Sequence, residues 1–327
     1  MKDIKYSITS NRIKLFKHLE NLRSLQLGTP KPILLHFMPT TNCNLSRFGF
    51  CENCCFKDAN KSNALDLDLE YAKKTIEQFR MIGTKAIEMT GFGDITVYKH
   101  INELIDYCHK LGFSIGANTN GNLIRNIKNL NKLKWLRLSM NTLDFFEIDK
   151  AYDMDYIRTT APNLEISGCY VNTSKIKETL PKLIKFVNKE NIFVRIVPNC
   201  IDTKDGIDKQ ISYLKKLVPK HNPYLFVSDF NVNTEKRRNN NCYMHLIKPA
   251  LAPDGWVYSC PSSELALENG TILNKKFRIC KGEEVFKFYT SKKSLKIKKH
   301  DCSYCKYNNF NEIIEDLLID VKHKEFT

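Results

Sequence analysis

Short apolar segments alternate with amphipathic helical segments through the first two thirds of this 327-residue chain. Helical spacing is clear in Leu69–Ile82 and Ile101–Leu111, and Gly83 and Gly112 follow directly, as expected of residues that end a helix with positive φ. We expect strands at Ile33–Met38, Lys85–Thr90, Phe113–Asn118, Lys134–Met140, Leu164–Val171 and Phe193–Pro198. Six β–α repeats predict a parallel sheet with helical crossovers, either an open doubly wound sheet or a partial barrel.

A different pattern begins near residue 225. Tyr224–Asn231 and Leu251–Ser259 are expected to be strands, with a Pro-Asp-Gly turn at 253–255. One further helix is expected around residues 10–26 and another over Asn311–Lys324. We therefore expect three parts: a helical segment at 1–32, an α/β domain at 33–225 and a small α+β domain at 226–327.

Composition limits the compartment and the class of partner. The N-terminus has no apolar signal-peptide core and no apolar run approaches 18 residues, so a reducing cytoplasm and no membrane association are expected. The net charge of +15 fits an anionic partner such as nucleic acid, or lysines dispersed over solvated faces; we favour the second. The basic residues are somewhat concentrated late in the chain, at Lys236, Arg237, Arg238, Lys287, Lys292, Lys293, Lys296, Lys298 and Lys299.

Most of the twelve cysteines form two groups, one near each end of the chain. The groups are Cys43, Cys51, Cys54 and Cys55, and Cys242, Cys260, Cys302 and Cys305. Thiols grouped in this way without a secretion signal usually bind metal, and both spacings favour iron–sulfur clusters. The first group follows the first expected strand at its carboxyl end, where parallel α/β folds place their chemistry. Three thiolates from one loop can hold a [4Fe–4S] cluster and leave the fourth iron open.

The first cysteine loop resembles that of the radical S-adenosylmethionine (SAM) superfamily, beginning with Pro-Thr-Thr-Asn-Cys-Asn-Leu at residues 39–45. The family spacing is C-x3-C-x2-C, whereas Cys43, Cys51 and Cys54 are spaced C-x7-C-x2-C, and Asn53 stands in place of an aromatic residue. The resemblance implies that these three thiols bind the cluster. Adjacent side chains point in different directions, so Cys55 is expected to pack or to line the site, although its role stays open.

Three further stretches follow in the family's order. Residues 90–94, Thr-Gly-Phe-Gly-Asp, stand where the family has a Gly-Gly-Glu-Pro-like turn whose backbone carbonyls hold the SAM ammonium. Asn-Thr-Asn-Gly at 118–121 is similar to the family's Thr-Asn-Gly, Ser139 to a serine that meets the SAM carboxylate, and Arg195 could neutralise that carboxylate. The resemblance thus implies SAM contacts from Gly91, Phe92, Gly93, Asp94, Asn118, Asn120, Ser139 and Arg195.

The second cysteine group is spaced C-x12-G-x4-C followed by C-x2-C. This spacing resembles the twitch domain, the short form of the SPASM extension, and implies an auxiliary [4Fe–4S] cluster held by Cys242, Cys260, Cys302 and Cys305. A structural four-cysteine zinc site is the alternative. Of the remaining thiols, Cys108 and Cys169 are expected in the core, whereas Cys200 and Cys280 are expected in loops.

The resemblance implies an α/β fold with a partial (β/α)6 barrel and a small C-terminal α+β domain. It also implies SAM, two [4Fe–4S] clusters and a flavodoxin- or ferredoxin-type reductant. In this family SAM is cleaved reductively to a 5′-deoxyadenosyl radical that abstracts a substrate hydrogen, and an auxiliary cluster would accept an electron in an oxidation.

The substrate stays open at this point. A similarly spaced auxiliary site occurs in 2-deoxy-scyllo-inosamine dehydrogenase, which favours a carbohydrate-like alcohol, but other family members modify peptides, and the basic tail keeps a nucleotide or nucleic acid possible. The rival of another class is a zinc-stabilised nucleic-acid-binding module without catalysis, against which the β–α repeats argue. No catalytic acid or base is identified: His36, Glu88, Asn118 and Tyr170 lie on strands and could face the barrel interior or be core polar residues.

Overall fold

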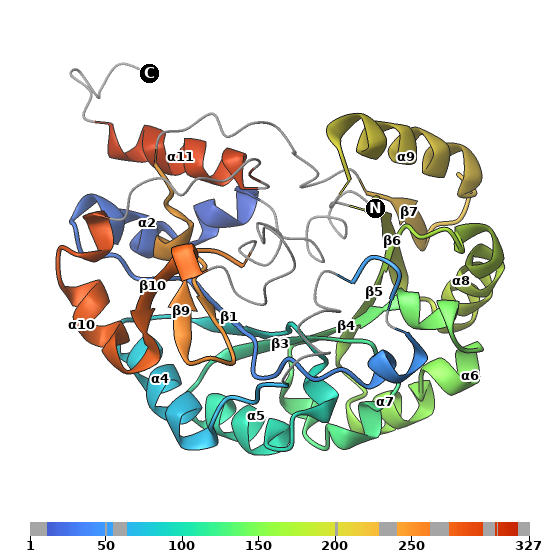
Figure 1. Cartoon of the computed structure of the whole chain (residues 1–327), viewed down its shortest axis with the longest axis horizontal. Coiled ribbons are helices and arrows are strands. Elements are labelled where there is room, and N and C mark those ends of the chain that lie inside the picture. Colours follow the sequence, from blue (N-terminus) through green and yellow to red (C-terminus); the bar gives the residue numbers. More distant parts are fainter. Residues whose placement is uncertain are drawn as a thin grey trace.

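A curved ten-stranded sheet with helices along its outer face dominates the structure, a computed structural model (Figure 1). The structure describes residues 12–49, 51–54, 64–199, 202–228, 241–261, 275–296, 305 and 307–319. The strand order is β10-β9-β8-β1-β2-β3-β4-β5-β6-β7, and β1 to β7 pair in parallel. Strand order follows chain order from β1 to β7, whereas a doubly wound sheet reverses at a switch point. The predicted partial barrel is therefore confirmed.

The first six strands agree with the predicted segments to within one or two residues, whereas β10 was not predicted. Their bounds are β1 Leu34–Phe37, β2 Ala86–Met89, β3 Ser114–Thr119, β4 Trp135–Ser139, β5 Glu165–Val171, β6 Phe193–Val197, β7 Leu225–Val227, β8 Ala250–Leu251, β9 Trp256–Tyr258 and β10 Arg278–Lys281. The α-helices are α2 Leu19–Gln26, α4 Leu69–Met81, α5 Ile101–Lys110, α6 Ile148–Ala151, α7 Met154–Thr160, α8 Ile176–Glu190, α9 Lys204–Leu217, α10 Val285–Thr290 and α11 Asn308–Leu318.

Alternation along the strands decides which side chains reach the barrel interior. On β4, Leu136 and Leu138 are fully buried against the helices, whereas Trp135, Arg137 and Ser139 are half-buried on the inner face. The helices are amphipathic to match: Asp68 caps the N-terminus of α4, its carboxylate accepts from Tyr71 N, and the helix buries one apolar face. The helix side of the sheet is thus a packed core, and the inner face is free to carry polar chemistry.

The N-terminal helix predicted around residues 10–26 is wrong in one respect. A 3-10 helix, η1 Arg12–Lys17, and α2 are separated at His18, whose φ of −124° and ψ of 48° are not helical. The last predicted helix is present as α11, and residues 320–324 of that prediction lie outside the described residues.

The C-terminal segment joins the sheet of the barrel. β8 pairs in parallel with β1 (His36↔Ala250), and β9 and β10 follow in antiparallel order. The predicted turn between β8 and β9 is present, with Gly255 at φ 77° and Gly255 N donating to Ala252 O at 3.1 Å. The strand predicted at Tyr224–Asn231 appears as the shorter β7, which extends the parallel run beside β6, and residues 229–231 of that prediction lie outside the described residues.

No helix within the described ranges combines the length and hydropathy needed to cross a bilayer. The basic residues of the late segment are partly visible: Lys287, Lys292 and Lys293 are exposed on or just after α10. Residues 236–238, 298 and 299 lie outside the described residues, and the side chain of Lys296 is likewise not described.

Candidate active site

Three thiols of the first cysteine group gather at the carboxyl end of β1. Cys43 caps the 3-10 helix η2, Asn44–Phe48, and a short turn closes from Cys54 N to Cys51 O at 3.0 Å. Burial raises the pKa of Cys43 and of Cys51 to about 12, and the charge of Cys54 contributes to both shifts. The three thiols therefore lie near enough to act on one another. Cys55 lies outside the described residues.

This donor set matches what a [4Fe–4S] cluster takes. Within the described ranges, no three His, Cys, Asp or Glu side chains lie close enough to share one metal ion. A [4Fe–4S] cluster does not require three ligands around one metal ion, because each thiolate binds a different iron of the cluster. Three half-buried thiols on one loop, with a non-thiolate contact to Cys43 from Asn120 Nδ2 at 3.8 Å, fit such a cluster in residue type and placement.

The cluster loop is fastened across the open end of the barrel to β5 and β6. Asn53 Nδ2 donates to Asn172 O at 2.6 Å, and Asn53 Oδ1 accepts from Asn199 Nδ2 at 3.1 Å. The Glu52 carboxylate accepts from Ser174 N and Oγ. The residue that departs from the family's aromatic position thus holds the longer loop in place. Sequence reasoning missed this role, since the partners are more than a hundred residues away.

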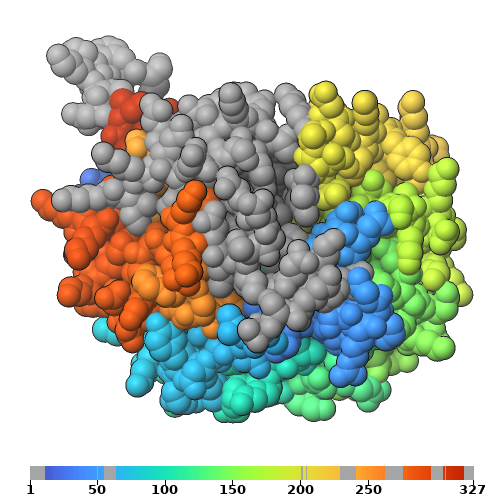
Figure 2. All heavy atoms as spheres, in the orientation of Figure 1, coloured from blue at the N-terminus to red at the C-terminus, as the bar shows by residue number. Residues whose placement is uncertain are grey.

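The outer side of the same loop packs on aromatic residues. Phe48 lies with its ring centre 4.9 Å from that of Phe146 and 6.4 Å from that of Phe145. Figure 2 shows this part of the chain, in blue, at the surface beside the green segment that contains these rings. The insertion therefore rests on the barrel rim rather than filling the barrel interior.

The turn after β2 lies directly against the cluster loop. Gly93 N donates to Thr40 O at 3.1 Å, and Asp94 N donates to Asn42 O at 2.7 Å. A Cβ on Gly93 would lie 1.8 Å from Asn42 O, so only glycine allows this approach of two backbones. The predicted SAM turn and the predicted cluster loop are thus in contact.

Two predicted SAM residues use their side chains elsewhere. The buried Asp94 carboxylate accepts from Thr96 N, Thr96 Oγ1, Thr119 Oγ1 and Asn120 N, at 2.9, 2.6, 2.8 and 2.5 Å. Phe92 is 2% exposed and packs with Met38 and other residues of a small apolar cluster. The side chains of both residues are thus engaged within the protein, which agrees with the backbone contacts that the resemblance implies for this turn.

The other predicted SAM residues lie along the inner face. Asn120 Nδ2 donates to Asn44 Oδ1 at 2.7 Å, which places it beside the cysteine loop. Ser139 and Arg195 flank Cys169 on the neighbouring strand, and Arg195 Nε donates to Cys169 Sγ at 3.3 Å. Asn118 lies deeper and pairs with Glu88. The expectation that Cys169 is a core thiol is wrong, because it is half-buried on the inner face.

A polar network occupies the inner face below these residues. Glu88 Oε2 lies 2.6 Å from Lys248 Nζ, Asn118 Nδ2 donates to Glu88 Oε1 at 3.0 Å, and His36 Nδ1 lies 3.5 Å from Oε2. Burial alone would raise the pKa of Glu88, but Lys248 and His36 outweigh it and hold that pKa well below its usual value. His36, Glu88 and Asn118 therefore face the barrel interior. The sequence had left open whether they do so or are polar residues of the core.

Tyr170 belongs to the opposite face of the sheet. It is fully buried, and its hydroxyl donates to Asp144 Oδ1 at 2.9 Å and lies 2.7 Å from Thr173 Oγ1. It is a satisfied core residue. Cys108 is a buried core thiol as predicted, whereas Cys280 lies buried in β10 and not in a loop. Cys200 lies outside the described residues.

Three cysteines of the second group are described. Cys242 is buried, Cys260 follows β9, and Cys305 precedes α11. Asn311, fully buried on α11, donates from Nδ2 to Cys305 Sγ at 3.8 Å and accepts from Tyr243 N at 2.9 Å. One amide thus connects Cys305 to the residue after Cys242. Cys302 lies outside the described residues.

The chain is similar in sequence to one bacteriocin biosynthesis protein over part of its length. It is 24% identical over 228 residues to the antilisterial bacteriocin subtilosin biosynthesis protein AlbA of Bacillus subtilis (strain 168). That match covers 65% of this chain and 46% of AlbA, so the chain spans about half the length of this curated relative. No family model matches the chain.

Solved structures share the fold. Streptococcus suis SuiB bound to the precursor peptide SuiA superposes with a TM-score of 0.53 at 14% identity, over 87% of this chain and 71% of SuiB. The anSMEcpe protein with bound AdoMet gives 0.51 at 15% identity, over 88% of this chain and 81% of that one. These likenesses concern the fold, while the order of motifs and the match to AlbA concern the sequence, and both agree with the resemblance to the radical SAM superfamily.

Proposed function

We propose that this chain uses SAM for radical chemistry on a peptide substrate. The observation that carries the proposal is the contact between the cysteine loop and the ends of β2 and β3, through Gly93, Asp94 and Asn120. These contacts bring the cluster residues and the SAM residues implied by the family motifs to one edge of the barrel.

Each group of residues has a separate role in this proposal. Cys43, Cys51 and Cys54 would hold a [4Fe–4S] cluster, and the backbone of Gly91–Asp94, with Asn120, Ser139 and Arg195, would hold SAM. When bound, the two supply a 5′-deoxyadenosyl radical that abstracts hydrogen. The guanidinium of Arg195 would neutralise the SAM carboxylate. The loop fastened by Asn53 and Glu52 covers part of the open end, which helps exclude water.

We propose a peptide, and not a carbohydrate-like alcohol, as the substrate. AlbA is named for bacteriocin biosynthesis, and SuiB was solved with a precursor peptide. Both names concern those proteins, and they support the same substrate class here. An oxidative modification is part of the proposal, with Cys242, Cys260, Cys302 and Cys305 holding an auxiliary [4Fe–4S] cluster that takes up the electron and a flavodoxin- or ferredoxin-type protein as reductant.

Reductive SAM cleavage tests the chemistry. Iron-loaded protein reduced with dithionite is expected to form 5′-deoxyadenosine and methionine, measured by chromatography, and Cys43→Ala is expected to form none. Cys280→Ser, which removes a thiol in β10 outside both groups, is the matched control and is expected to retain product formation. If fully iron-loaded wild-type protein forms no 5′-deoxyadenosine, the proposal is contradicted.

The substrate class needs a separate experiment. Peptides encoded next to this chain's gene are expected to increase 5′-deoxyadenosine formation and to change in mass, whereas carbohydrates and oligonucleotides at the same concentration leave both unchanged. A carbohydrate or an oligonucleotide that is modified in place of the peptides contradicts the assignment of a peptide substrate.

A further inference from the structure

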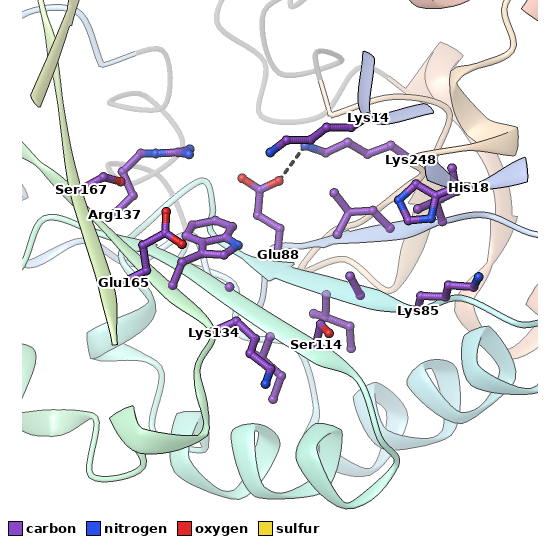
Figure 3. Close-up of a pocket in the computed structure, with 17 residues that line it drawn as sticks. Lys14, His18, Lys85, Glu88, Ser114, Lys134, Arg137, Glu165, Ser167 and Lys248 are labelled. Atoms are coloured by element: carbon purple, nitrogen blue, oxygen red, sulfur yellow. Dashed lines mark hydrogen bonds and ion pairs between the residues drawn. The ribbon is translucent and has the colours of Figure 1, made fainter. Parts of the chain in front are cut away.

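A cavity of about 560 Å³ lies inside the barrel, toward the amino ends of the strands. Its wall is the inner face of β1 to β5, and Lys14 of η1 and Lys248, just before β8, reach into it from the other side (Figure 3). This volume is in the range of small-ligand pockets, roughly 300–1,000 Å³. The cavity is therefore large enough for one amino-acid side chain of a peptide together with its backbone.

Positive charge predominates in the lining. Five lysine and arginine residues face two glutamates: Lys14, Lys85, Lys134, Arg137 and Lys248 against Glu88 and Glu165. Glu88 pairs with Lys248, and Lys85 pairs with Glu20 outside the lining, so Lys14, Lys134 and Arg137 are to be set against Glu165 alone. A lining of this kind favours an anionic ligand.

The cations also act on one another. Burial lowers the pKa of Lys14, and Arg137 lowers it further. Burial likewise lowers the pKa of Arg137, with Arg195 as the next cause. An anion placed among these groups would relieve this repulsion.

Arg137 is held in a fixed orientation. Its Cζ lies 5.0 Å from the ring centre of Trp135, and Nη1 donates to Asn118 Oδ1 at 3.3 Å. Gly116 on β3 makes room for the ring, because a Cβ there would lie 2.0 Å from the indole. A planar guanidinium held at two points suits bidentate recognition of a carboxylate.

The position of Arg137 relates the cavity to the SAM end. Ser139 follows two residues later on the same face of β4, a rise of roughly 7 Å. A carboxylate at Arg137 would thus belong to the reacting residue of the substrate or to its neighbour.

We propose that this cavity binds a carboxylate of the substrate, held by Arg137 and Lys14. The inference rests on the proposed function and makes it specific: the peptide presents either an acidic side chain or its terminal carboxylate beside the reacting position.

Direct binding tests this inference. Iron-loaded protein with saturating SAM is titrated by calorimetry with N-acetyl-glutamate N-methylamide, with N-acetyl-alanine and with N-acetyl-glutamine N-methylamide. Binding of the first indicates an acidic side chain and binding of the second a terminal carboxylate. SAM is present so that its own carboxylate site is filled. Equal affinity for the neutral glutamine probe, or for inorganic phosphate, would overturn the carboxylate assignment.

Variants locate the site. Arg137→Gln and Lys14→Gln are each expected to weaken binding about tenfold, as loss of a charge-assisted hydrogen bond does. Lys216→Gln removes an equal charge from the exposed face of α9 and is expected to leave the affinity unchanged. Lys14 lies on the short 3-10 helix η1 and not on a strand of the barrel, so its variant stays informative even if Arg137→Gln fails to fold. Unchanged affinity in Lys14→Gln and in folded Arg137→Gln contradicts the inference, and failed SAM cleavage would refute the proposed function without bearing on this equilibrium.

Discussion

Gly91 and Gly93 lie two residues apart in the same turn and differ in what a side chain would meet. A Cβ on Gly93 would overlap Asn42 O at 1.8 Å, a backbone atom that cannot rotate away, whereas a Cβ on Gly91 would meet nothing closer than 3.5 Å. Gly91 therefore has room for a side chain, whereas Gly93 must be glycine because the cysteine loop approaches its backbone too closely for a Cβ.

We predict that Gly93→Ala displaces the cysteine loop from the end of β2 and lowers both iron content and SAM affinity. Gly91→Ala is the matched control and is expected to keep both close to wild type. Iron and labile sulfide analysis with equilibrium SAM binding measures the effect. Equal behaviour of the two variants would show that the backbone contact is not needed for the site.

Cys54 and Cys55 test the register of the cysteine loop. Cys54 contributes to the pKa of both Cys43 and Cys51, so we expect it to be the third ligand. Cys54→Ala is predicted to abolish reductive SAM cleavage, and Cys55→Ala is predicted to keep it, as measured by 5′-deoxyadenosine after dithionite reduction. The opposite pair of results would mean that the ligand loop is shifted by one residue.

At the scale of elements, strands β1 to β6 and the helices α4 and α5 were predictable because their apolar pattern coincides with burial. The break at His18 was not, because η1 and α2 share one apolar pattern and only the backbone angles separate them. Cys280 was expected in a loop, but it lies in the four-residue strand β10, which pairs with β9. Short strands of this kind depend on tertiary partners more than on their own residues.

The candidate site shows the same division between local and long-range information. The cysteines and the strand-end motifs are local in sequence and could be found there. The roles of Asn53, Glu52 and Lys248 depend on partners far along the chain, and no periodicity marks such pairs. The direction in which Tyr170 points depends on strand parity, which the strand bounds decide to a single residue.

Lys248 joins the C-terminal segment to the barrel through Glu88 on β2. Because the folded-state pKa of Glu88 is depressed, this pair stabilises the fold above the unfolded pKa, and the contribution is lost as pH falls through the folded pKa. We predict that Lys248→Met destabilises the fold at neutral pH by about 3–5 kcal/mol, because it leaves a buried carboxylate without its cation.

Urea unfolding across pH measures this effect. The double variant Glu88→Gln/Lys248→Met is expected to recover much of the loss, since no buried charge is left unpaired. Lys132→Met breaks the more exposed pair with Asp106 and is expected to cost less than about 1 kcal/mol. A loss in Lys248→Met no larger than in Lys132→Met would show that the buried pair carries little stability.

On the scale of the whole molecule, barrel and C-terminal segment share one sheet. β8 continues the barrel beside β1, and Tyr71 of α4 donates to Gly255 O at 2.9 Å in the turn that follows. Lys248 then reaches the cavity from this segment. The region assigned to the auxiliary cluster is thus part of the frame that surrounds the cavity.

The two proposed clusters are nevertheless predicted to be separable. Replacing Cys302 and Cys305 by alanine is expected to lower iron from about eight to about four atoms per chain, the contents of two and of one [4Fe–4S] cluster. SAM cleavage is expected to persist, because the three thiols at β1 are unchanged. Conversion of the true substrate is expected to fail, because the electron acceptor is missing. Cys280→Ser is the matched control, since that thiol lies in β10, and it should leave iron unchanged. Iron that stays near eight in the double variant would show that the C-terminal cysteines hold no cluster and would remove the oxidative step from the proposal.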